Sequence, residues 1–234
     1  MKTLLTTLWL SIPLAFAAYH YGPGQDRLKD DAAAGFLKAA TGAAAAGDHA
    51  AAVTACEAAL AALPADAVAA SRQIRLLRAK ERMPVGQLPE AHDELDSLLT
   101  ELTADPAADA EVTRETRTAL ATSKYYLAWL MRLEGGSEEQ WMPEIEASRQ
   151  HFRQLAGEAQ AAGQTVMVTT QRENLESAIR LARMDLTELQ GLPLPKQCKN
   201  CKSGKCNNKS KPKKSPPEDS RKAGKSMGPD ESGS

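Results

Sequence analysis

Apolar residues between Gln25 and Gln190 recur at the three- and four-residue spacing of helix faces, and glycine or proline interrupts them about every one or two helices. No Asn-Gly or Asp-Gly turn flanked by alternating apolar runs occurs in this region, so β-hairpins are not indicated. The pattern predicts an all-α fold of antiparallel helical hairpins. Its seven helices have the approximate spans 27–46, 49–62, 66–82, 88–103, 108–134, 138–162 and 165–190.

Composition strengthens the helical prediction. Aromatic residues make up only 4% of the chain, and alanine fills 21 of the 39 positions from Ala32 to Ala70. Alanine is the best helix former, whereas strands favour bulky branched and aromatic side chains. An all-β fold is therefore not expected.

The segment from Gly47 to Pro64 resembles the second helix of a tetratricopeptide repeat. In that family a turn glycine precedes a small residue, a core residue, two packing residues and a helix-ending proline, and the matching positions are Gly47, Ala52, Cys56, Ala59, Leu60 and Pro64. Counting back to the first helix of the pair puts Phe36 at the bulky anchor and Ala39, Ala40 and Ala43 at packing positions. The resemblance implies a short solenoid of closely nested helix pairs.

Two later hairpins follow the same logic more loosely. The second has its packing positions at Ala91, Leu95, Leu98 and Leu102, before Pro106. The third, across Gly135-Gly136, pairs Tyr125, Ala128 and Trp129 with Ile145, Arg149, Phe152 and Leu155. Ser137 and Gln140 have the spacing of a capping box at the start of its second helix.

The last helix is expected to close the stack. Leu175, Ile179, Ala182, Leu186 and Leu189 form one apolar seam, and charged residues occupy the other faces. A polar outer face is what a solenoid needs at its end. The alternative for the same seam is a coiled-coil dimer.

The N-terminus has the pattern of a secretory signal peptide over residues 1–17. Lys2 is followed by an apolar stretch from Leu4 to Ala18, with a small-x-small cleavage site at Ala15-Phe16-Ala17. The stretch is shorter than the roughly twenty residues of a membrane span. We therefore expect cleavage after Ala17, a lead-in at 18–26, a helical repeat domain at 27–191, and an exported protein in the periplasm or secreted.

Charge is divided between the body and the C-terminal region. Residues 196–234 have a formal charge of +7 and residues 19–195 have −9, within an overall charge of −1. Residues 192–234 lack apolar material for a core and are predicted to be a disordered Cys/Lys-rich tail. The tail is either a solubilising extension or a contact for an anionic envelope surface. Nucleic acid is not expected as a partner, because the tail lacks aromatic residues for base stacking.

Aromatic residues gather in one part of the body. Tyr125, Tyr126, Trp129 and Trp141 are the candidates for a partner-binding surface, because tyrosine and tryptophan dominate binding hot spots. The alternative is that these side chains form the packed seam of their hairpin.

Three cysteines cluster in the tail at Cys198, Cys201 and Cys206. In an exported protein such a cluster favours disulfides, and an odd thiol suggests a disulfide-linked dimer. Zinc is the alternative, although the sequence after Cys206 supplies no fourth His or Cys ligand. Cys56 is predicted to be a small buried hydrophobic residue.

Catalytic motifs are missing from the body. It has no glycine-rich phosphate loop, no Gly-x-Ser-x-Gly and no His-Glu-x-x-His, and His92 with Asp96 is the only metal-like spacing. The sequence thus predicts no enzyme and no committed cofactor or metal. It predicts an exported protein–protein interaction scaffold of the cell envelope, whose partner is another envelope or secreted protein. The alternative is a thiol module in the tail, for disulfide linkage or zinc binding, supported by the helical body.

Overall fold

The structure is a computed structural model that describes residues 2–21, 23–195 and 203. Every regular element within these residues is a helix, so the predicted all-α fold is confirmed. The helices are α1 (Lys2–Tyr21), α2 (Pro23–Ala45), α3 (His49–Ala62), α4 (Val68–Arg82), α5 (Leu88–Ala104), α6 (Ala110–Leu133), α7 (Glu138–Ala161), α8 (Thr165–Arg183) and α9 (Leu186–Gly191).

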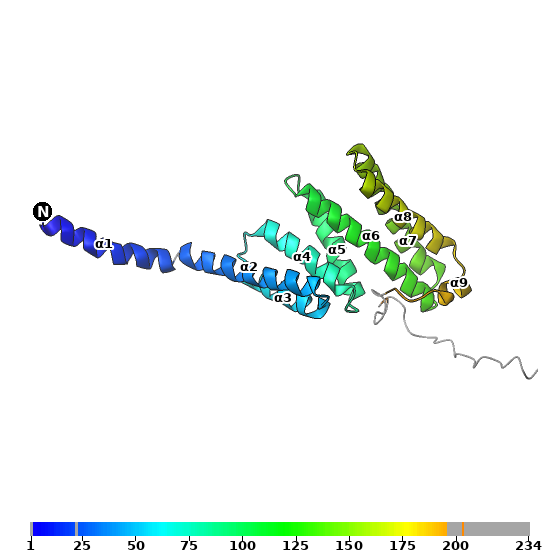
Figure 1. Cartoon of the computed structure of the whole chain (residues 1–234), viewed down its shortest axis with the longest axis horizontal. Helices are drawn as coiled ribbons and strands as arrows, with labels where there is room; N and C mark the ends of the chain where they lie inside the picture. Colours follow the sequence, from blue (N-terminus) through cyan, green and yellow to red (C-terminus); the bar gives the residue numbers. More distant parts are fainter. Residues whose placement is uncertain (1, 22, 196–202, 204–234) are drawn as a thin grey trace, which may run out of the picture.

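Consecutive helices pack against one another as a row of antiparallel hairpins (Figure 1). The chain forms α2 with α3, α4 with α5, and α6 with α7, and α8 then packs on α7. Contacts that skip one helix join α4 to α6. Alternate helices of the stack therefore lie on the same side, which lets residues distant in sequence share one surface.

Glycine and short polar residues define the hairpin turns. Gly47 and Gly135 adopt φ values of 77° and 78°, a left-handed conformation that glycine takes without a side-chain clash. Asp48 then caps α3 by accepting a hydrogen bond from the Ala51 N–H at 3.0 Å. At the start of α7, the Gln140 side chain accepts one from the Ser137 N–H at 2.8 Å, as the capping-box spacing predicts.

The core becomes bulkier along the stack. Its first cluster is small and joins Ala40, Cys56, Ala59 and Ile74. The second is rich in leucine from α5 and α6. The third joins α6, α7, α8 and α9 through Trp129, Trp141, Ile145, Phe152 and Leu181, among others. Alanines thus bring α2 close to α3, whereas large side chains fill the wider space around α6 and α7.

The predicted register of α2 is right at Ala40, which is buried, but wrong at Phe36 and Ala39, which are exposed. Phe36, the expected anchor, is 42% exposed, and the stripe that faces α3 consists of Ala33, Leu37 and Ala40. Small side chains at Ala33 and Ala40 allow the backbones of α2 and α3 to approach. A phenylalanine ring at the centre of that contact would hold them apart.

The predicted helix 165–190 is also wrong as a single element, because it breaks between α8 and α9. Met184 has an extended backbone, and Asp185 caps α9 by accepting from the Glu188 N–H at 2.7 Å. Leu186 of the expected seam is 43% exposed, whereas Leu189 is 1% exposed. The outer face of α8 is polar, as predicted for a closing helix, at Arg172, Glu173, Glu176, Arg180 and Arg183.

Helix α1 extends away from the stack in Figure 1. Large apolar side chains along it are exposed, including Trp9, Ile12, Leu14 and Phe16. Among the described helices, none combines the length and apolar character that crossing a membrane requires.

Candidate functional site

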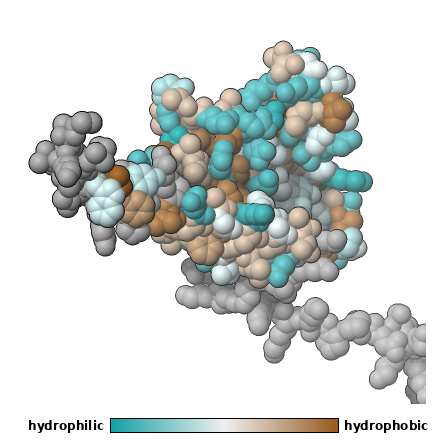
Figure 2. Space-filling model, turned by 60° about the vertical axis from the view of Figure 1, so that its left-hand side comes forward, coloured by the Kyte–Doolittle hydropathy of each residue, from teal (hydrophilic) through white to brown (hydrophobic). Residues whose placement is uncertain are grey.

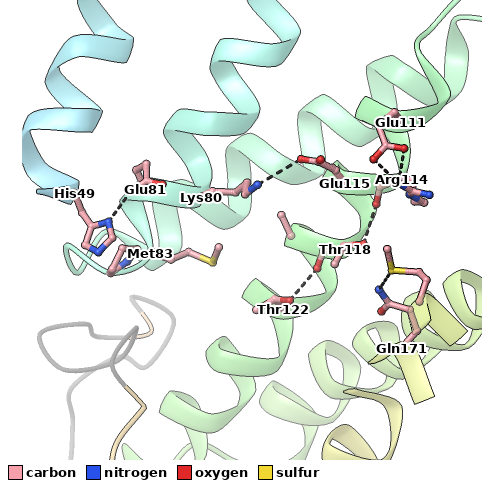
Figure 3. Close-up of a pocket in the computed structure, with 13 residues that line it drawn as sticks. His49, Lys80, Glu81, Met83, Glu111, Arg114, Glu115, Thr118, Thr122 and Gln171 are labelled. Carbon is pink, nitrogen blue, oxygen red and sulfur yellow. Dashed lines mark hydrogen bonds and ion pairs between the residues drawn. The ribbon is translucent and has the colours of Figure 1, made fainter. Parts of the chain in front are cut away.

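A groove with a volume of about 510 Å³ opens where α4, α6 and α8 come together. Its lining also includes His49 at the start of α3 and Met83 and Pro84 after α4 (Figure 3). In Figure 2 hydrophobic surface is visible in the hollow of the stack, below hydrophilic rims. We call this site the α4–α6–α8 groove.

Helix α6 supplies the central wall of the groove. Glu111, Glu115, Thr118 and Thr122 line it at three- and four-residue spacing, so they share one face of the helix. The hydroxyls of Thr118 and Thr122 donate to the carbonyls of Arg114 and Thr118, each at 2.9 Å. Because these donors are already satisfied within the helix, this part of the wall is less polar than its sequence suggests.

The floor of the groove is apolar. Met83 and Ala119 are buried beneath it, and Pro84 and Met167 also line it. Gln171 of α8 is buried and donates to the Met167 sulfur at 3.5 Å, which holds that side chain at the edge of the groove. Methionines are adaptable contacts for apolar ligand groups.

Two ion pairs and a histidine–carboxylate hydrogen bond form the rim. The Lys80 Nζ lies 3.4 Å from the Glu115 Oε2, and the His49 Nδ1 lies 2.6 Å from the Glu81 Oε2. Arg114 pairs with Glu111 and also donates to the Gln164 side chain at 3.2 Å. The rim therefore presents both signs of charge in pairs around an apolar floor. Such a lining fits a peptide segment with an apolar anchor better than a polyanion.

The predicted aromatic residues divide into two groups. Trp129 and Trp141 are 7% and 9% exposed and belong to the core. Tyr125 and Tyr126 are half-buried against that core. The centre of the Tyr125 ring lies 5.4 Å from that of Tyr126 and 5.9 Å from that of Trp129, both in edge-on arrangements. The two indoles thus take the packing role, whereas partner binding stays a prediction for the tyrosines.

The two tyrosines lie next to the groove-lining residues of α6. Tyr125 and Tyr126 follow Thr122 by three and four residues, so they continue the groove-lining face of α6 by one turn. The sequence indicated the C-terminal end of this α6 face, because its aromatic residues were predicted to bind a partner. It did not predict the groove itself, which also needs residues of α4 and α8.

The predicted thiol site at Cys198, Cys201 and Cys206 lies outside the described residues, so disulfide linkage and zinc binding stay predictions. Within the described part of the chain, no cluster of three or more His, Cys, Asp or Glu side chains is arranged to hold a metal ion. Cys56 is fully buried, as predicted, and burial raises the pKa of its thiol to about 11.

His92 belongs to a charged cluster between α5, α6 and α7. Its Nε2 lies 3.2 Å from the Lys124 Nζ and 3.6 Å from the Glu144 Oε2. Asp96, the residue that sequence spacing paired with His92, lies 3.9 Å from the Lys124 Nζ instead. The cluster joins three helices and is not part of the groove lining, so we assign it to packing.

Comparison with protein-family models, curated proteins and solved structures finds no match for this chain.

Proposed function

We propose that this protein is an exported helical-repeat scaffold whose α4–α6–α8 groove binds an extended segment of another envelope or secreted protein. The observation that carries the proposal is the groove itself, in which three helices that alternate along the chain place an apolar floor between ion-paired rims. Helical repeats use shared surfaces of this kind for extended ligands. Export is proposed from the leader pattern at residues 1–17.

The lining indicates which features of the partner matter. Met83, Pro84 and Met167 suit an aliphatic or aromatic anchor of modest size. Lys80 and Glu115 are each almost half-exposed. Charged or polar groups of the partner that flank the anchor can therefore bind to either side chain in place of their mutual ion pair. Tyr125 and Tyr126 extend the same face of α6 and offer further contact area at one end.

Filling the groove tests this function. In Thr118→Trp, an indole occupies the central wall, so recovery of the partner from the native envelope should fall by about tenfold or more. Thr170→Trp is the matched control, because Thr170 is exposed on α8 and does not line the groove. Circular dichroism should show the same helicity for both variants. Equal recovery with the two folded variants would contradict the proposal.

A further inference from the structure

A second surface, on α2, is exposed and has no helix packed on it among the described residues. Leu28, Ala32, Gly35, Ala39 and Gly42 are spaced four, three, four and three residues apart, and all of them are exposed. Gly35, Ala39 and Gly42 lie on the side of α2 opposite the stripe of Ala33, Leu37 and Ala40 that packs on α3. Leu28 and Ala32 also border a hollow shared with the end of α3. We call this surface the outer face of α2.

Large apolar side chains make this face different from an ordinary solvated one. Leu28 is 55% exposed and Phe36, at its edge, is 42% exposed. The other end of the stack, on α8, presents arginines and glutamates to solvent. The two ends are therefore unequal, and an uncapped apolar end of a helical stack is prone to associate.

Two glycines on the face make no close packing contact with the described part of the chain. A Cβ at Gly35 or at Gly42 would meet nothing within 4 Å, so neither position needs glycine for packing inside the described molecule. Glycine in a helix interior is nevertheless destabilising relative to alanine. Close approach of a further helix would account for both positions.

Two charged residues beside this face, Asp31 and Lys38, are placed so that those of one copy can pair with those of a second copy. Asp31 and Lys38 are exposed, and neither has an ion-pair partner among the side chains that the structure describes. They lie at equal distances along the helix from the point between Ala34 and Gly35. A two-fold axis through that point, with the helices antiparallel, sets each Asp31 opposite Lys38 of the other copy.

We propose that the outer face of α2 is a homodimer interface, in which a second copy of this chain packs antiparallel across Gly35. The small residues bring the helices together, Leu28 and Phe36 are covered, and two symmetric Asp31–Lys38 pairs fix the register. This inference does not depend on the groove.

Sedimentation of the exported, processed protein measures the dimer without association through the apolar leader. Reductant keeps tail cysteines from linking copies. The wild type should dimerise, and Gly35→Leu should weaken the dimer by about tenfold or more because leucine blocks close approach. Gly157→Leu on α7 is the matched control, since Gly157 is also an exposed helical glycine with open space around it. It should leave the dimer intact.

Charge exchange tests the register. Asp31→Lys and Lys38→Asp should each weaken self-association, because each creates like-charged pairs across the axis. An equimolar mixture of the two variants should recover association, since every pair across the axis is then opposite in sign. A monomeric wild type would overturn the proposal. A dimer that persists in folded Gly35→Leu, or a mixture that stays monomeric, would also overturn it.

Discussion

Arg132 is the residue on which the C-terminal end of the stack depends. Its buried guanidinium lies 4.6 Å from the centre of the Trp141 ring and donates to the carbonyls of Leu181 and Met184. Those carbonyls belong to the last turn of α8 and its cap, where the helix itself leaves them without donors. Burial lowers the pKa of the guanidinium, because desolvation disfavours its charged form. The hydrogen bonds and the contact with Trp141 must offset this desolvation free energy.

Arg132→Ala should therefore destabilise the protein by about 2–4 kcal/mol, because it removes charged hydrogen bonds and leaves buried carbonyls unsatisfied. Urea unfolding followed by circular dichroism measures the effect. Arg153→Ala, at an exposed position of α7, should change stability by less than about 0.5 kcal/mol. Equal effects of the two substitutions would show that Arg132 does not hold α8.

Cys56 gives a prediction about pH. Because burial raises the pKa of its thiol from 9.0 to about 11, the folded state retains a proton that the unfolded state loses first. The free energy of unfolding should thus be unaffected by this group below pH 9 and should fall as pH rises from about 9 towards 11. Cys56→Ala should lack this component. The measurement is the difference between wild-type and variant unfolding curves across that range, and parallel curves would contradict the prediction.

At the scale of elements, an arginine row joins α4 to its neighbours. Glu94 of α5 is nearly buried and accepts from the Arg78 Nε at 3.2 Å and the Arg82 Nη1 at 2.9 Å. Arg82 also reaches Glu57 of α3 at 3.0 Å. Nearer the start of α4, Arg72 and Arg75 both donate to Glu101, whose carboxyl pKa is lowered chiefly by these hydrogen bonds. These ion pairs thus add to the buried Ile74, Leu76 and Ala79 in holding α4 against its neighbours.

Glu94→Gln should destabilise the protein by about 2–4 kcal/mol, because it leaves neighbouring guanidinium groups without their buried counter-charge. Thermal and urea unfolding measure the change. The control is Glu173→Gln on the exposed face of α8, which should have an effect below about 0.5 kcal/mol. A neutral Glu94→Gln would mean that apolar contacts alone position α4.

The helix boundaries could be predicted from the sequence because they depend on local chemistry. Gly47, Pro64, Gly135 and Gly163 end or separate helices where the pattern placed them. The rotation of a helix depends on contrast between its faces, and α2 has little. With apolar or small residues on nearly every side, its sequence did not reveal that Leu37, rather than Phe36, would pack against the core. The break at Met184 also depends on Arg132, 52 residues earlier in the chain.

The candidate site was harder to predict for a related reason. Tyr125 and Trp129 marked one face of α6, but the groove also needs Met83 and Met167, which reach it only when alternate helices stack. No local sequence motif indicates that Met83 and Met167 will lie in one groove.

At the scale of the whole molecule, we propose that the stack binds its partner through the α4–α6–α8 groove. The direct measurement is photocrosslinking in the native envelope, with a photoreactive residue placed in turn at Thr118, at Thr122 and at Thr170, followed by mass spectrometry. We expect Thr118 and Thr122 to crosslink to the same short segment of one partner, and Thr170 not to do so. Crosslinks to that partner from Thr170 alone, or none from either groove position, would contradict this proposal.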